Sequence, residues 1–186
     1  IAASPPDASQ VKEWLDSTIK ISDREQLWRA YANALSQRPD GDQKALAWLE
    51  SVQGVQDITS LRSERAVWAE KLDDWRTIIA QLAPLAQQDR ISPKTWNRLA
   101  TAYVNLQDEA GLKALLPSAP DTQAAIDTKL AMANRAIALG NVAIAKNWLQ
   151  ALPPAMRDDK AQQQNLWELA QASGDTNLYL TTSNNL

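Results

Sequence analysis

Apolar residues recur along this chain at intervals of three and four, the spacing that places them on one face of an α-helix. The pattern is visible at Leu27 and Tyr31, and again at Trp96, Leu99 and Tyr103. No stretch shows the strict alternation of apolar and polar residues that a half-buried strand requires. The sequence therefore predicts an all-α protein.

Short breaks between the helical patterns divide the chain into helical hairpins. The breaks fall at Gly41-Asp42, Asp73-Asp74, Gln107-Asp108, Gly140-Asn141 and Gly174-Asp175. Their second residues are separated by 32, 34, 33 and 34 positions, which indicates a repeat. The predicted helix pairs are 23–38 with 42–53, 58–72 with 74–88, 93–106 with 108–116, 121–139 with 141–151, and 159–173 with 175–182.

The repeat pattern leaves a short segment at each end of the chain. Residues 8–19 predict one further helix, which would cap the N-terminal end of the stack. We therefore divide the chain into an N-terminal segment with its capping helix (1–21), a helical repeat domain (22–182) and a polar tail (183–186).

The same register predicts how the two helices of a hairpin pack. Small residues let antiparallel helices approach closely, and apolar residues on the second helix face them. The positions seven residues before the first member of each break are Ala34, Ala66, Ala100, Ala133 and Trp167. The positions five residues after it are Leu46, Ile78, Leu112, Ala145 and Tyr179.

A period near 34 residues is the length of a tetratricopeptide unit, and the chain resembles that family over residues 22–182. The resemblance implies a right-handed superhelical solenoid of about five antiparallel helix-turn-helix units. It also implies a module that assembles protein complexes. The residues that carry the resemblance are Trp96, Leu99, Ala100, Tyr103, Gln107 and Asp108 in one unit and Ala133, Gly140, Ala145 and Leu149 in the next.

The composition excludes most catalytic chemistry. The chain has no histidine and no cysteine, so it lacks a Ser-His-Asp or Cys-His pair, a thiolate or imidazole metal site and a disulfide. Its five glycines form neither of the common phosphate-binding motifs. We therefore expect no catalytic residues, no cofactor and no bound metal, and we do not expect an enzyme.

Carboxylates are the remaining candidates for chemistry, because two of them in different environments can act as general acid and base. Their spacing favours a structural role instead. One short polar residue recurs at the start of the second helix of each unit, where its side chain can accept a hydrogen bond from a free backbone N–H. These expected helix caps are Asp42, Asp74, Asp108, Asn141 and Asp175.

Eight tryptophans are unusual for a chain without phenylalanine, and most lie on the apolar face of a predicted helix. We interpret them mainly as core residues, although an exposed indole could also grip a partner. Trp75 and Trp148, which lie beside polar or charged positions, are the candidates for partner binding. The basic residues Arg62 and Arg65 are the other candidates, because they share one helix.

The charge balance argues against nucleic acid as a partner. The chain has 19 Lys and Arg against 22 Asp and Glu, a net charge of −3, whereas nucleic-acid binders usually carry a basic patch. No apolar stretch approaches the roughly 20 residues of a membrane-spanning helix. The lack of cysteine fits the periplasm or cell envelope, with the cytoplasm as the alternative.

These observations lead to one main functional hypothesis and two alternatives. The main one is a non-catalytic scaffold of a bacterial envelope assembly or export system, which binds a protein segment in its concave groove. The first alternative is the helical domain of a larger peptidoglycan lytic transglycosylase, to which Leu149-Gln150-Ala151-Leu152-Pro153 after the Gly140 turn looks similar. The second is self-association through the apolar residues Leu178, Tyr179 and Leu180.

Overall fold

The computed structural model describes residues 10, 13, 21–51, 59–87, 91–157, 160–174 and 176–183. Every regular element in these ranges is a helix, which confirms the all-α prediction. The expected capping helix at 8–19 and the tail beyond residue 183 lie outside the described residues. The chain divides into two compact units, Ile1–Gln87 and Gln88–Leu186.

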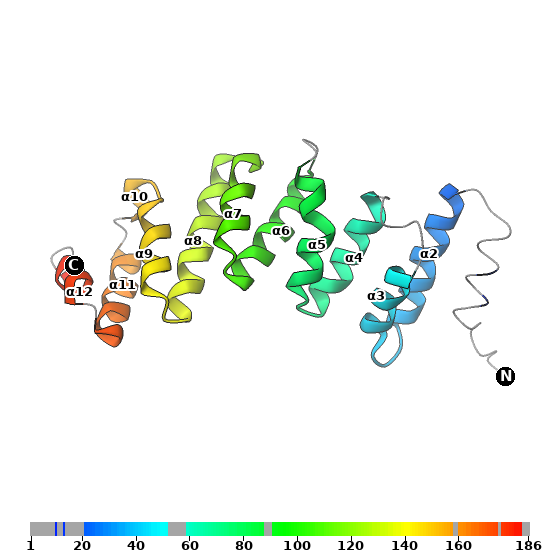
Figure 1. The fold of residues 1–186 in the computed structure, drawn as a ribbon, viewed down its shortest axis with the longest axis horizontal. Helices are drawn as coiled ribbons and strands as arrows, with labels where there is room; N and C mark the ends of the chain where they lie inside the picture. Colours follow the sequence, from blue (N-terminus) through cyan, green and yellow to red (C-terminus); the bar gives the residue numbers. More distant parts are fainter. Residues whose placement is uncertain are drawn as a thin grey trace. The chain divides into compact units, whose positions relative to one another are not determined.

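The first unit contains two helical hairpins (Figure 1). Helix α2 packs against α3, α3 against α4, and α4 against α5. Trp28, Leu49, Leu61, Trp68 and Ile78 are buried in its core. The helices are α2 (Ile21–Ser36), α3 (Gly41–Ser51), α4 (Thr59–Lys71) and α5 (Trp75–Ala86).

The second unit contains the other hairpins that the sequence predicts, α6 with α7, α8 with α9 and α11 with α12 (Figure 1). The first helices of consecutive hairpins also pack on each other, α6 on α8 and α8 on α11. The short elements η2 and α10 were not expected. The bounds are α6 (Pro93–Leu106), α7 (Glu109–Leu115), η2 (Leu116–Ser118), α8 (Thr122–Ala138), α9 (Val142–Gln150), α10 (Pro154–Arg157), α11 (Lys160–Ser173) and α12 (Thr176–Ser183).

The backbone itself carries the repeat. In the turn within each hairpin, one described residue has a positive φ, and these residues are 33, 34, 33 and 34 positions apart. The first break between helices is predicted at Gly41-Asp42, whereas the left-handed residue of that turn is Asp40. Gly41 is instead buried at the start of α3, where a Cβ would lie 2.5 Å from the carbonyl oxygen of Leu35. The left-handed residues are Asp40, Asp73, Gln107, Gly140 and Gly174.

The helix-cap predictions hold at two of the described second helices. Asp74 accepts a hydrogen bond from the backbone N–H of Thr77 at 3.1 Å, and Asp108 accepts one from Gly111 at 2.9 Å. These bonds satisfy donors that the first helical turn leaves free.

At two other positions the cap prediction is wrong, and at a third it is untested. Asn141 precedes α9 but its side chain makes no cap bond, and its amide nitrogen donates to Gln107 Oε1 at 2.8 Å in the turn between α6 and α7. Asp42 lies one residue inside α3 and faces Lys71 Nζ at 3.5 Å. Asp175 lies outside the described residues.

The small-residue prediction also depends on the turn. Ala66, Ala100 and Ala133 are buried as expected, whereas Ala34 is exposed. In α2 the fully buried alanine is instead Ala32, because the turn before α3 takes residues 37–40 and shifts the register of α2.

Candidate functional site

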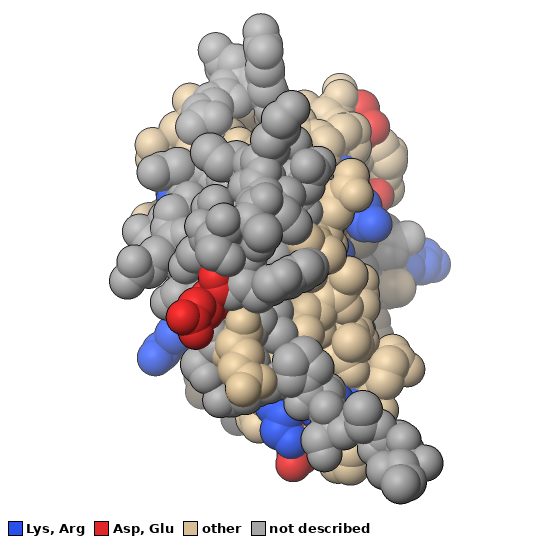
Figure 2. All heavy atoms as spheres, turned by 90° about the vertical axis from the view of Figure 1, so that its right-hand side faces the viewer, with Lys and Arg blue, Asp and Glu red and all other residues tan. Residues whose placement is uncertain are grey.

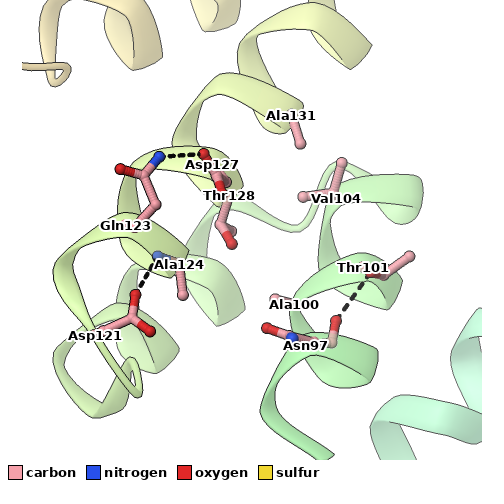
Figure 3. Close-up of a pocket in the computed structure, with 10 residues that line it drawn as sticks. All are labelled: Asn97, Ala100, Thr101, Val104, Asp121, Gln123, Ala124, Asp127, Thr128 and Ala131. Carbon is pink, nitrogen blue, oxygen red and sulfur yellow. Dashed lines mark hydrogen bonds between the residues drawn. The ribbon is translucent and has the colours of Figure 1, made fainter. Parts of the chain in front are cut away.

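A groove lies between α6 and α8 in the second unit (Figure 3). Its volume is about 470 Å³, within the roughly 300–1,000 Å³ typical of ligand sites. Small apolar side chains form its floor and polar side chains form its rim. The lining residues are Asn97, Ala100, Thr101, Val104, Asp121, Gln123, Ala124, Asp127, Thr128 and Ala131.

Two carboxylates stand on the α8 side of the groove (Figure 3). Asp121 precedes α8 and accepts a hydrogen bond from the backbone N–H of Ala124 at 2.7 Å, which caps the helix. Asp127, six residues further along the chain, accepts a bond from Gln123 Nε2 at 2.7 Å. Both aspartates are exposed, so the α8 rim carries negative charge at the solvent boundary.

The α6 side of the groove is polar but uncharged. Asn97 and Thr101 are exposed and lie one turn apart, and the Thr101 hydroxyl donates to the backbone oxygen of Asn97 at 2.9 Å (Figure 3). Ala100 lies between them and is buried. This wall therefore offers an amide and little bulk, and no basic side chain lines the groove to balance the aspartates.

The corresponding helices of the first unit are bridged by side chains. The Ser60 hydroxyl of α4 donates to Glu25 Oε1 of α2 at 2.5 Å, and Glu25 pairs with Arg29 at 2.7 Å. Arg29 also faces Glu64 Oε2 of α4 at 4.0 Å. Glu64 lies nine residues before the left-handed Asp73, and the matching residue of α8 is Ala131. A methyl group replaces a long carboxylate side chain there, which helps to leave the α6–α8 groove open.

The structure places the predicted residue Arg65 inside the first unit. Its side chain is only 3% exposed. Its Nε donates to the backbone oxygen of Leu49 at 2.9 Å, and a terminal guanidinium nitrogen donates to the same oxygen. Burial lowers the pKa of Arg65, the nearby Glu50 carboxylate opposes this, and Arg62 adds to it. Arg65 therefore binds the last turn of α3 rather than presenting its charge on the surface.

The other predicted binding residues do not form one site. Arg62 is half-buried and lines a small cavity of about 290 Å³ with Glu50, Arg65 and Gln81. Trp75 is half-buried at the start of α5, in the same unit. Trp148 is 3% exposed in the core of the second unit.

The tryptophans as a group confirm the core interpretation. Trp75 and Trp167 are half-buried, and Trp14 lies outside the described residues. The remaining five are buried: Trp28, Trp48, Trp68, Trp96 and Trp148.

Charges outside the groove are mixed. On the face shown in Figure 2, the acidic and basic atoms of described residues are scattered rather than gathered into one patch. Within the described ranges, no three Asp or Glu side chains come together as a metal site would require. At the C-terminal hairpin, Leu180 is 56% exposed, while Tyr179 packs its ring 5.7 Å from that of Trp167.

Comparison with known proteins adds no relative. No family model, curated protein or solved structure matches this chain. Among the residues that the structure describes, no helix is long and apolar enough to cross a membrane.

Sequence reasoning missed the groove residues Asp121, Asp127 and Thr128. One signal was available for Thr128. It lies 12 residues before the left-handed Gly140, as the fully buried Leu61 lies 12 residues before the left-handed Asp73. A hydroxyl at a position where another repeat buries leucine marks a departure from the core pattern.

Proposed function

We propose that this protein is a non-catalytic scaffold that binds a segment of a partner protein in the α6–α8 groove. The observation that carries the proposal is the open groove between the first helices of two consecutive hairpins, with a polar rim over a floor of small residues. In a tetratricopeptide-like solenoid, the arrangement we propose for these hairpins, the first helices line the concave binding surface.

The groove chemistry supports recognition rather than catalysis. The Asp121 side chain caps α8 and the Asp127 side chain holds Gln123, so each carboxylate already has a structural partner. Binding a partner segment requires shape and complementary charge, and no group that changes its protonation state. We further propose a bacterial envelope assembly or export system as the setting, which the lack of cysteine supports.

Photo-crosslinking from the groove tests the scaffold proposal. A benzophenone amino acid would replace Thr101 or Gln123, which are exposed and line the groove from its two sides. The control carries the same group at Lys146, an exposed position on α9. Irradiation in cells of the source organism is expected to give one protein adduct from both groove positions and none from the control.

Two other results would count against the proposal. Equal adducts from Lys146 and from the groove positions would mean that the groove does not select a partner. Recovery of peptidoglycan fragments in place of a protein would favour the alternative, the helical domain of a lytic transglycosylase.

A further inference from the structure

The α6–α8 groove carries negative charge that no described residue of the chain neutralises. Asp121 and Asp127 both stand on its rim, and neither forms an ion pair with any residue that the structure describes. No lysine or arginine lines the groove, whereas Glu109 on α7 pairs with Lys113 at 3.2 Å. The groove therefore has the electrostatic complement of a cation.

A second, independent feature points to a ligand in the same groove. Thr128 is only 9% exposed and lines the groove, and its hydroxyl has no hydrogen-bond partner among the described residues. Figure 3 shows this hydroxyl directed into the space between α8 and α6. The hydroxyl oxygen is not one of the fully buried polar atoms that lack a partner, so it is accessible from the groove and can bond to a molecule that enters it. A donor that enters the groove would supply the missing hydrogen-bond partner.

The two features together define the occupant. An ammonium or guanidinium group is a multiple hydrogen-bond donor with no acceptor, so it can bond to carboxylates and to a hydroxyl oxygen at once. Asn97 on the opposite wall offers a further amide oxygen. A carboxylate, a phosphate or an acidic peptide would instead meet uncompensated repulsion from both aspartates.

We propose that the α6–α8 groove binds a basic peptide segment, whose lysine or arginine side chain enters between the Asp121 and Asp127 carboxylates and bonds to Thr128. The inference rests on the proposed scaffold function, and it adds the chemistry of the partner segment. The flanking backbone of that segment would lie along Asn97 and Gln123, whose amides can pair with an extended chain.

Peptide selection tests this proposal without knowledge of the natural partner. A phage-displayed library of random heptapeptides would be selected on the full chain, and the selected peptides would be synthesised with a fluorophore for anisotropy titration. We expect enrichment in lysine or arginine. We also expect affinity to fall steeply as NaCl rises from about 0.05 M to about 0.5 M, because added salt screens a charged contact.

Two double variants, each of which loses two negative charges, show whether peptide binding depends on the charges of the groove or on the net charge of the protein. The double variant Asp121→Asn with Asp127→Asn keeps a good helix cap and a hydrogen-bond acceptor while removing both charges. The control, Asp74→Asn with Asp108→Asn, raises the net charge by the same two units at caps outside the groove. Dissociation constants are expected to rise by roughly tenfold or more in the groove variant and to stay unchanged in the control.

A third variant, Ala131→Trp, fills the groove and distinguishes failure of this inference from failure of the scaffold proposal. The basic-segment inference would be overturned if the selected peptides lack basic residues, or if their dissociation constants do not change in the charge-removal variant. If Ala131→Trp still blocks these peptides, the groove remains a binding site. Selection of no peptide, or binding that Ala131→Trp does not affect, would overturn both. Far-UV circular dichroism of each variant verifies that it remains helical.

Discussion

Gly111 permits the close contact between α7 and the preceding helix, and its replacement by alanine gives a sharp test of this packing. A Cβ at this position would lie 2.6 Å from Tyr103 Cδ1 and would overlap other atoms of the same ring. Tyr103 is 8% exposed, and Gly111 also donates its N–H to the Asp108 cap, so neither partner moves easily.

Two opposing terms set the magnitude. Overfilling a packed site costs about 1–3 kcal/mol. Replacing glycine by alanine within a helix returns up to about 1 kcal/mol of intrinsic helix propensity. We therefore expect Gly111→Ala to lower the free energy of unfolding by about 1 kcal/mol. With a urea slope of about 1–3 kcal/mol per M, the midpoint falls by roughly 0.3–1 M.

The assay is urea unfolding followed by far-UV circular dichroism, made as a double-mutant cycle with Tyr103→Ala. Removing the ring eliminates the overlap, so Gly111→Ala in that background is expected to raise stability by up to about 1 kcal/mol. The sign of the effect thus reverses between the two backgrounds. If Gly111→Ala is destabilising to the same extent in both, the overlap with Tyr103 is not its cause.

Three further predictions concern single side chains and turns. Gly140→Ala places a Cβ on a left-handed residue and is expected to lower the free energy of unfolding by about 1 kcal/mol. Asp73→Gly removes the Cβ from another left-handed residue, so it relieves the same backbone strain and is expected to raise the thermal unfolding midpoint. Arg65→Leu removes two charge-assisted bonds to the Leu49 carbonyl and is expected to cost about 2 kcal/mol in urea unfolding; an unchanged midpoint would contradict this. Burial, and secondarily the Asp108 carboxylate, raises the pKa of Tyr103. The Tyr103 hydroxyl therefore contributes stability below its unfolded pKa of about 10, and this contribution is lost as pH rises through the folded pKa. The Tyr103→Phe variant should lose less stability than the unmodified protein above about pH 10, and parallel plots of unfolding free energy against pH for the two proteins would refute the assignment.

Helix α6 shows how far local signals determine this fold. The predicted range 93–106 coincides with the observed helix Pro93–Leu106. Ser92 accepts a hydrogen bond from the Thr95 N–H at 3.2 Å, Pro93 occupies the first turn, and the left-handed Gln107 ends the helix. Each signal acts within a few residues of the boundary, so it can be recognised in the sequence alone.

The two shortest helical elements were missed because they contain too few residues to show a periodic pattern. Helix α10 has four residues, Pro154–Arg157, and η2 has three. Neither is long enough to show an apolar period, although each has a proline in its first turn that could have indicated a helix start.

Arg65 shows where reading the sequence by charge fails. It lies four residues after Leu61 and three before Trp68, so all three share one face of α4. That spacing places Arg65 on the buried face of α4. Its charge nevertheless led to its prediction as a partner-binding residue on the surface. Only the packed structure brings the Leu49 carbonyl of α3 within reach and supplies the partner that makes burial possible.

The sequence by itself determined the helices, most of their turns and the repeat, because helical period and capping depend on residues within one or two turns of each other. It did not determine the groove, whose opposing walls come from helices separated along the chain by α7 and η2. Whether two such helices enclose a space depends on side-chain volumes that meet only after packing, as with Ala131 in α8 and Glu64 in α4. The tertiary structure alone therefore decided which polar residues face one another.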